Sequence, residues 1–309
     1  MRYQELGRTG LKLSEIGFGA SPLGDEFGSV DEQEGIRAVE KALDLGINFF
    51  DVAPYYGRGL AEIRLGAALR GRREEAIVAT KCARFDVDRF DFSARSARES
   101  IDASLQRLHM DYVDILHVHD VEFGEKRQIV EETLPALREI QQSGKARFIG
   151  ITGLALKMLL EIATEFRVDC ILSYCRYNLL NQDLSIALAP FAKQNGIGLI
   201  NASPLHMGLL SDGGAPEWNP APAAVKIAAK QVVALCRRRN VNPSSFAIRF
   251  ASQYPDVAST LAGMATVDYV CSNLLALEQL PDPELMAEVR DIVRPVQHLM
   301  WVTGRPENH

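Results

Sequence analysis

The sequence has no long hydrophobic run. No stretch approaches the roughly 20 apolar residues that a membrane-spanning helix requires. The first residues, MRYQELGRTG, also lack the apolar core of a signal peptide. We therefore expect a cytoplasmic protein without a membrane partner.

A surplus of basic residues is also missing. Lys and Arg number 34 against 40 Asp and Glu, which gives a formal net charge of -6 and a pI near 5.6. Proteins that bind nucleic acids or acidic lipids need clustered Lys and Arg. We therefore expect a small-molecule ligand and no nucleic-acid partner.

Cysteine is scarce, and its spacing excludes two kinds of scaffold. The five cysteines are an odd number, and no two of them form a CxxC pair. A disulfide framework needs an even number, and a zinc ribbon needs paired spacings. We therefore expect reduced thiols at all five positions, namely Cys82, Cys170, Cys175, Cys236 and Cys271.

The 309 residues, 47% of them apolar, alternate short β-branched runs with longer amphipathic segments. Such alternation predicts right-handed βαβ units and a parallel sheet that is buried on both faces. Eight units in a chain of this length indicate an α/β fold, the (β/α)8 TIM barrel, which usually takes roughly 250 residues. The predicted strands are 15 to 19, 47 to 51, 76 to 81, 112 to 119, 146 to 152, 169 to 174, 197 to 202 and 257 to 263.

We expect one domain over residues 1 to 309, because no segment is rich enough in Pro, Gly or Ser to be a linker. Ahead of the first barrel strand, RYQELGRTGLKLS places GRTG between two short alternating runs. This pattern is typical of a β-hairpin. We predict that the hairpin caps the bottom of the barrel.

Four polar residues lie at or just after the ends of consecutive predicted strands. Asp51 ends the second strand, Lys81 the third and His119 the fourth, and Tyr56 follows in the loop after the second. The carboxyl ends of the strands form the active-site face of a (β/α)8 barrel. The sequence therefore predicts that these four side chains converge on one mouth.

Together these residues offer acid–base chemistry. A phenol has a pKa near ~10 in water, and a nearby ammonium group favours its charged form. We expect Lys81 to lower the pKa of Tyr56, and Asp51 to hold Lys81 in place. His119 then orients a carbonyl or hydroxyl oxygen beside the phenol by a hydrogen bond. The four residues are the predicted catalytic set.

Two other interpretations of these motifs remain open at this point. His117 and His119 are two apart on a strand, so both could face one metal ion, with His206 as a further ligand. The turn GFGASPLG, with Asp51 downstream, has the glycines of a dinucleotide-binding turn. However, Pro22 and a helical pattern that begins only near Asp31 fit such a turn poorly. We favour no bound metal and a buried core role for His117.

The motifs DVAPYYG, ATK and DYVDILHVH, with the early LGRTGLKLSEIGFG, resemble those of the aldo-keto reductases along essentially the whole chain. This resemblance implies a (β/α)8 oxidoreductase that binds a nicotinamide cofactor, with catalytic residues Asp51, Tyr56, Lys81 and His119. The stretches GITGL, ILSYCRYN and ASPLHMGLL are similar to the plant-type branch of the family. That branch implies NAD-dependent oxidation of L-galactose at C1 to L-galactonolactone.

The resemblance also implies a set of cofactor-binding positions. Some of them depart from the usual family pattern: Thr152 and Gly153 replace Ser-Asn, Tyr174 replaces Gln, and Ala202 replaces an aromatic residue. The expected cofactor-binding residues are Ala20, Thr152, Gly153, Tyr174, Ser203, Leu205, Gly208, Gly263, Thr266 and Asn273.

Substrate contacts are expected from Tyr56, His119 and Asp120. Asp120 stands where reductases of apolar aldehydes often have Trp, and a carboxylate can accept hydrogen bonds from sugar hydroxyls. It could instead be a solvated loop residue or the partner of a nearby Arg. L-Fucose, L-gulose and D-arabinose are alternative substrates. General aldehyde or pyridoxal reduction and a nicotinamide-binding regulatory barrel are alternative functions. We expect a monomer or weak homodimer.

The choice of NAD over NADP follows from residues 262 to 274, AGMATVDYVCSNL. NADP-dependent relatives resemble one another in a Lys and an Arg that face the 2′-phosphate, and this chain has Gly263 and Tyr269 at those positions. Asp268 adds a negative charge. Another Arg, for instance Arg249, could replace the missing cations. The resemblance therefore implies a preference for NAD.

Overall fold

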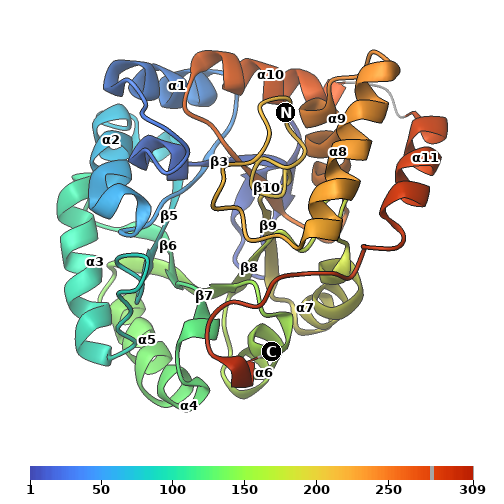
Figure 1. Ribbon diagram of the computed structural model, residues 1–309. Helices are drawn as coiled ribbons and strands as arrows, with labels where there is room; N and C mark the ends of the chain where they lie inside the picture. The colour runs from blue at the N-terminus through green and yellow to red at the C-terminus, as the bar shows by residue number, and fades with distance from the viewer. Residues whose placement is uncertain (279–281, 309) are drawn as a thin grey trace.

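The computed structural model describes residues 1–278 and 282–308, and its centre is a closed barrel of eight parallel strands (Figure 1). The strands follow one another around the barrel in chain order, and β10 closes the ring by pairing with both β3 and β9. The (β/α)8 prediction is confirmed. The barrel strands are β3 (Ile16–Gly19), β4 (Phe49–Asp51), β5 (Ile77–Cys82), β6 (Val113–Val118), β7 (Ala146–Gly153), β8 (Cys170–Tyr174), β9 (Gly198–Ala202) and β10 (Ser259–Gly263).

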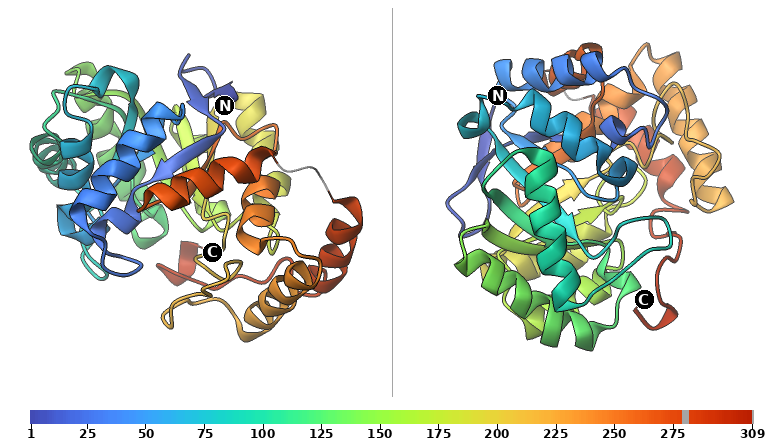
Figure 2. Two further views of the ribbon diagram at one scale, coloured as in Figure 1. Left: turned by 90° about the horizontal axis from the view of Figure 1, so that it is seen from above. Right: turned by 90° about the vertical axis from the view of Figure 1, so that its left-hand side faces the viewer.

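Helices surround the barrel and connect its strands (Figure 2). Within residues 1–278 and 282–308, no helix combines the length and apolar character needed to cross a bilayer. The helices are α1 (Glu32–Asp44), α2 (Leu60–Ala68), α3 (Ala94–Leu108), α4 (Lys126–Gln128), α5 (Leu134–Gln142), α6 (Leu156–Glu165), α7 (Ala189–Asn195), α8 (Ala223–Arg238), α9 (Pro243–Ser252), α10 (Val267–Glu278) and α11 (Pro283–Val293).

The residues at both ends of helix α1 explain where the helix begins and ends. The carboxylate of Asp31 accepts a hydrogen bond from the backbone N–H of Glu34 at 2.9 Å, so it satisfies one of the free donors of the first turn. Val39 and Ala42 are fully buried against the barrel. After the helix, Gly46 has a φ of 89°, a conformation that only glycine adopts at little cost.

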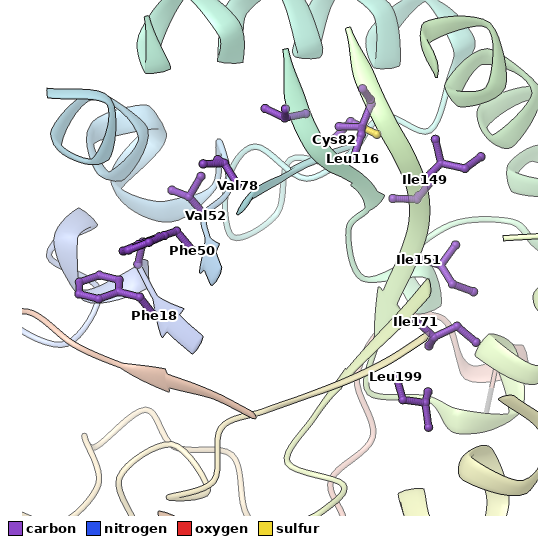
Figure 3. Close-up of a cluster of buried hydrophobic side chains, with 14 of the residues drawn as sticks. Phe18, Phe50, Val52, Val78, Cys82, Leu116, Ile149, Ile151, Ile171 and Leu199 are labelled. Carbon is purple, nitrogen blue, oxygen red and sulfur yellow. The ribbon is translucent and has the colours of Figure 1, made fainter. Parts of the chain in front are cut away.

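The main hydrophobic core lies between the strands and the helices. Side chains that point outward from the barrel, among them Phe18, Phe50 and Leu116, are fully buried there (Figure 3). Burial of one such side chain stabilises the fold by about 1.5–3 kcal/mol. Because each strand contributes residues to this layer, the strands are fixed in position and their ends form a rigid frame.

The N-terminal hairpin closes the bottom of the barrel, as predicted. Its strands, β1 (Tyr3–Glu5) and β2 (Lys12–Ser14), pair in antiparallel fashion. Leu6 and Leu13 are fully buried in a cluster with Phe49 and Ile115 from the barrel strands. Gly198, the first residue of β9, lies so close to Leu6 that a Cβ there would be 2.4 Å from the leucine side chain.

The carboxyl ends of the strands carry loops with unusual backbone geometry. Four residues other than glycine have positive φ in the loops after β8 and β9: Cys175, Ser203, His206 and Met207. Such conformations cost about 1–3 kcal/mol each and persist where the surrounding structure holds them. They lie at the end of the barrel where (β/α)8 enzymes have their active sites.

Candidate active site

Lys81 is the centre of the polar cluster at the barrel mouth. It lies on β5 and is 1% exposed. Its Nζ lies 2.5 Å from Asp51 Oδ1, 2.9 Å from the carbonyl oxygen of Val52 and 3.4 Å from Tyr56 Oη. Burial, the largest single influence, would lower the pKa of Lys81, but the charges and hydrogen bonds of Asp51 and Tyr56 together outweigh it and raise that pKa. The ammonium group is therefore charged and directed at the phenol.

Tyr56 is held in place by the contact of two loops. It begins the short helix η2 (Tyr56–Gly59), which follows β4. Gly24, in the loop after β3, touches the same backbone: a Cβ on Gly24 would be 2.5 Å from the carbonyl carbon of Tyr56. A Cβ on Gly57 would be 2.6 Å from the carbonyl oxygen of Gly24. The backbone around Tyr56 can take this position only because both residues are glycine.

The expected lowering of the Tyr56 pKa is wrong for the protein alone. Burial raises the pKa of Tyr56 to about 12, and the charge of Lys81 opposes this shift without overcoming it. A buried phenolate loses its hydration, and the negative charges of Asp51 and Asp120 also disfavour it. The phenol is therefore protonated at neutral pH, as a proton donor must be.

His119 follows β6 and stands beside Tyr56. The two rings meet edge to face, with their centroids 5.9 Å apart. His119 is 5% exposed, and burial, together with the charge of Lys81, lowers its pKa well below the ordinary value. The imidazole is therefore neutral at pH 7. It can hydrogen-bond to a substrate oxygen without adding a charge, in agreement with the role that the sequence predicts.

His117 lies one layer deeper and is a core residue, as we favoured. It is fully buried beside Lys81 in the strand register, and its Nε2 lies 3.4 Å from the sulfur of Cys170. Burial lowers the pKa of His117 to about 3. Within the described part of the chain, no group of three or more His, Cys, Asp or Glu side chains is arranged to hold a metal ion. A metal pair of His117 and His119 has no further ligands there.

Asp120 forms an ion pair with Arg84, which is the nearby Arg considered as its alternative partner. The Arg84 guanidinium hydrogen-bonds to Asp120 Oδ2 and lies 3.9 Å above the centre of the Tyr55 ring. Asp120 is 2% exposed, so it is not a solvated loop residue. The same carboxylate oxygen is 3.7 Å from His119 Nε2. The pair therefore borders the position where a substrate oxygen would meet His119.

Two charged groups near the mouth, one partly and one fully buried, were missed by sequence reasoning. Arg84 comes three residues after Lys81, and Glu122 comes three residues after His119. Glu122 is fully buried, and its carboxylate accepts a hydrogen bond from the backbone N–H of Leu154 at 2.8 Å. The only sign of these residues in the sequence was a charge a few positions beyond a predicted strand end. Most charged residues at such positions are exposed to solvent, so the sign is weak.

The structure brings most of the expected cofactor residues to adjacent strand ends. Thr152 and Gly153 end β7, Tyr174 ends β8, and Ser203 directly follows β9. The register places these ends side by side, since Tyr174 pairs with Ala202. The remaining residues continue the same rim: Ala20 follows β3, Gly263 ends β10, and Leu205 and Gly208 lie in the loop after β9.

Thr266 and Asn273 lie apart from these strand ends, on the segment of α10. Thr266 precedes the helix, and its hydroxyl accepts a hydrogen bond from the backbone N–H of Tyr269 at 3.2 Å. Asn273 lies about two turns further along and is 8% exposed. Glu34 from α1 also reaches this end, where its carboxylate accepts a hydrogen bond from the Val267 N–H at 3.0 Å. A negative group therefore already occupies the start of α10.

The segment GFGASPLG does not form a dinucleotide-binding turn. Residues Ser21–Gly24 form a short 3-10 helix, η1, and α1 begins only at Glu32. Ala20 is fully buried, and its backbone N–H donates to the carbonyl of Asp51 at 2.9 Å. No long helix opens over this turn, so pyrophosphate cannot meet a helix N-terminus here as the motif requires.

A closed parallel barrel with a largely buried Asp–Lys–Tyr–His cluster at its carboxyl end is typical of one class of oxidoreductase. The profile of the aldo/keto reductase family matches residues 15–294, and the chain belongs to that family. The members of this family bind a nicotinamide cofactor. The donors at the mouth suit such a group, because hydroxyls from Thr152, Tyr174 and Ser203 and a protonated phenol lie on one rim.

Individual relatives narrow the comparison. The chain is 47% identical to the L-galactose dehydrogenase of Arabidopsis thaliana, with 98% of each chain covered. It is 30% identical to the D-threo-aldose 1-dehydrogenase of a Pseudomonas species, over 82% of this chain and 86% of that protein. The structure resembles that of an aldo-keto reductase from Bacillus halodurans in its holo form, with a TM-score of 0.78 and 27% identity over 100% and 99% of the two chains.

Proposed function

We propose that this protein oxidises an aldose, L-galactose in preference to others, at C1 to the aldonolactone with NAD as acceptor. The observation that carries the proposal is the contact of buried Asp51 and Lys81 with the partly buried Tyr56, together with neutral His119 beside the phenol. The set provides one proton donor and acceptor and one neutral hydrogen-bonding group at a single position. Oxidation of an alcohol by hydride loss needs both.

Each side chain of the cluster has a separate role in this reaction. A bound nicotinamide supplies the hydride acceptor. In the oxidative direction Tyr56, as phenolate, takes the proton of the C1 hydroxyl, and His119 orients that oxygen by a hydrogen bond. Lys81 stabilises the phenolate, and Asp51 keeps Lys81 charged and fixed. In reverse, the protonated phenol returns the proton to the sugar oxygen.

The ion pair of Arg84 and Asp120 supports a polyhydroxylated substrate. Guanidinium groups donate and carboxylates accept several hydrogen bonds each, so a pair of them beside His119 complements sugar hydroxyls. Such a charged pair is poorly suited to an apolar aldehyde. The similarity to the Arabidopsis and Pseudomonas sugar dehydrogenases points to the same class of substrate.

The choice of NAD is supported at the start of α10. Residues 262 to 274 contain no Lys or Arg, and Tyr269 is 57% exposed. The Glu34 carboxylate at the Val267 N–H adds a negative charge that would repel a 2′-phosphate at this position. Arg249 is 7% exposed on α9, so it is not a freely mobile replacement for the missing cations.

The test is a panel of aldoses with NAD, followed by NADH absorbance and compared by kcat/KM. We expect L-galactose to be the best substrate, with L-fucose, L-gulose and D-arabinose weaker and aromatic aldehydes poor. A panel led by pyridoxal or aromatic aldehydes would instead identify a general reductase. If the protein bound the cofactor but turned over no substrate, the result would favour the alternative of a nicotinamide-binding regulatory barrel.

Several expectations about the whole protein remain part of this proposal. We propose a single catalytic domain that acts in the cytoplasm on a small-molecule aldose, as a monomer or weak homodimer. Sedimentation at several protein concentrations measures the oligomeric state. Neither a nucleic acid nor a membrane partner is needed for the reaction.

A further inference from the structure

The last segment of the chain crosses the carboxyl end of the barrel. We call residues 297–308 the C-terminal strap; Figure 1 shows it in red, running from α11 toward α6. At its start, Asn181 Nδ2 donates to the carbonyl of Gln297 at 2.9 Å. The next residue, His298, places its Nδ1 2.6 Å from Asp183 Oδ1. The beginning of the strap is therefore attached to the loop after β8.

The other end of the strap is attached to the segment after β6. The side-chain amide of Asn308 donates to the carbonyl of Glu122 at 2.8 Å and to the carbonyl of Gly124 at 2.9 Å. The backbone N–H of Arg305 donates to the same Glu122 carbonyl at 2.9 Å. Gly304 packs so closely that a Cβ there would be 2.3 Å from this oxygen. Asn308 is 7% exposed, so these bonds are shielded from water.

The side chain of Glu122 extends the attachment to two further strands. Its Oε1 accepts from the Leu154 N–H beyond β7 at 2.8 Å and from the Tyr174 hydroxyl at the end of β8 at 3.4 Å. A Cβ at Gly153 would be 2.4 Å from Glu122 Oε2, so the carboxyl group fills the space above that glycine. One buried residue thus joins the strap, the β6 loop and the ends of β7 and β8.

This junction lies next to the residues that face the substrate. Asp120 has a φ of 51°, a left-handed conformation that costs energy unless neighbouring contacts maintain it. On one side of Asp120 the backbone is held by the bond from its own N–H to Thr152 Oγ1 at 3.0 Å. On the other side, Glu122 and Asn308 provide the fixed point. His119 directly precedes Asp120, so its position depends on the same stretch of backbone.

The charge state of Glu122 suits such a role. Burial, together with the charge of Asp120, raises the pKa of Glu122 to about 8. At neutral pH the group is therefore mainly uncharged, and it does not compete with Asp120 for Arg84. The groups that face it are Asp120, Arg84 and Tyr174.

We propose that Glu122 and Asn308 are positioning residues for the active site, and that the C-terminal strap acts through them to fix His119 and Asp120 for catalysis. The activity readout of this inference rests on the proposed function. The consequence is that a side chain at the end of the chain controls turnover without touching the substrate.

The first test compares Asn308→Ala with the matched control Glu307→Ala. Glu307 lies in the same strap, where its side chain bonds to the exposed side chain of Arg305, whereas Asn308 bonds to both carbonyls of the β6 loop. We expect Asn308→Ala to lower kcat on the best aldose about tenfold with a smaller change in KM for NAD, since small misplacement of a catalytic group is costly. Glu307→Ala should keep wild-type kinetics. Equal kinetics in the two variants would overturn the proposal.

The second test uses hydrogen exchange, which does not depend on knowing the reaction. The peptide that covers residues 118–124 should exchange faster in Asn308→Ala than in Glu307→Ala or the wild type. If no aldose is turned over by the wild type, the proposed function fails, but this measurement still decides whether the strap holds the loop. Unchanged exchange would overturn the proposal.

The third test replaces Glu122. Glu122→Gln keeps an oxygen that accepts from the Leu154 N–H and fills the same volume, so it should retain kcat within about threefold, since it preserves the acceptor. Glu122→Ala removes the acceptor and should fall at least as far as Asn308→Ala. Rescue by Gln but not by Ala supports a positioning role. Wild-type kcat in Glu122→Ala contradicts it, and so does a fall in Glu122→Gln equal to that in Glu122→Ala.

Discussion

The two sides of the barrel mouth are built in different ways. On the side of β4 to β6, buried or partly buried charged side chains are paired with each other, as Lys81 is with Asp51 and Arg84 with Asp120. On the side of β7 to β10, the expected cofactor surface consists of hydroxyls, glycines and backbone in left-handed conformations, as at Ser203 and Gly208. In the proposed function, the first side supplies the acid–base groups and the second shapes the cofactor site.

This difference decides how each side tolerates change. A buried charge that loses its partner strongly destabilises the fold, so the charged residues on the side of β4 to β6 depend on each other in pairs. A surface made of hydroxyls and backbone depends on local conformation, and single side chains there contribute less. We therefore expect large, specific effects on one side and smaller, graded effects on the other.

The largest expected effect is that of Tyr56→Phe. Loss of a positioned acid–base group costs about 10²–10⁴ in rate, so kcat should fall by that factor while the dissociation constant for NAD stays near the wild-type value. Steady-state kinetics and fluorescence titration with NAD measure the two quantities. Near wild-type turnover would show that another group moves the proton.

The pH dependence of kcat follows from the raised pKa of Tyr56. Oxidation needs the phenolate, and below the pKa of about 12 its fraction rises about tenfold per pH unit. Between pH 7 and 9, kcat for aldose oxidation should rise with that slope wherever chemistry limits the rate, whereas lactone reduction should not. Profiles in both directions, at pH values where the protein stays folded, give the measurement. A flat oxidative profile would rule out Tyr56 as the titrating base.

Breaking the second ion pair should reduce stability. Arg84→Met leaves Asp120 buried without its partner, and such a loss costs about 3–5 kcal/mol of the free energy of unfolding. The exposed pair of Arg58 and Asp86 is the control, because Arg58→Met should cost less than about 1 kcal/mol. Urea denaturation measures both variants. Equal losses would mean that Arg84 and Asp120 contribute no more than a surface pair.

On the cofactor side, a preference for NAD of at least about tenfold in kcat/KM is expected, since each missing charge-assisted bond to a 2′-phosphate is worth about 1.5–3 kcal/mol. Gly263→Lys combined with Tyr269→Arg should narrow or reverse the preference. Adding Glu34→Gln, which removes the negative charge at the start of α10, should narrow it further. Steady-state kinetics with NAD and with NADP, at a fixed sugar concentration, measure this preference. Equal kcat/KM of the wild type with NAD and NADP would mean that the 2′-phosphate of NADP binds at another part of the protein.

The smallest effect is expected at Thr152, where the two sides meet. Its hydroxyl accepts from the Asp120 N–H at 3.0 Å, so Thr152→Val should lower the free energy of unfolding by about 1 kcal/mol. Thr152→Ser keeps the hydroxyl and should behave as the wild type does. Thermal denaturation of the two variants tests the difference. If Thr152→Val and Thr152→Ser are equally stable, the hydrogen bond between Thr152 and Asp120 does not couple the two sides.

The sequence predicted the barrel strands and the convergence of the four proposed catalytic residues because both depend on local patterns. Each strand is a short apolar run, and Asp51, Lys81 and His119 sit at the ends of such runs, where a parallel barrel must bring them together. Tyr56 was found through the motif around it. The sequence did not predict the net direction of the Tyr56 pKa shift, because the cost of burying a phenolate depends on packing from several loops.

Arg84 and Glu122 were missed for the same reason. Their burial results from elements far away in the chain: Arg84 lies on Tyr55, and Glu122 lies beneath the strap that ends near Asn308. Contacts between residues 186 positions apart leave no periodic trace in a sequence. Asp120 shows the intermediate case, since its partner was anticipated as an Arg but not identified.

The contact between Gly24 and Gly57 has a consequence for protein engineering. The backbones after β3 and β4 touch without side chains between them. The conformation of each loop therefore depends on the sequence of the other. Transplanting either loop from a relative with a larger residue at its contact point would displace the backbone of Tyr56. Libraries that aim at new substrates should therefore exchange residues 20–28 and 52–59 together, or leave both unchanged.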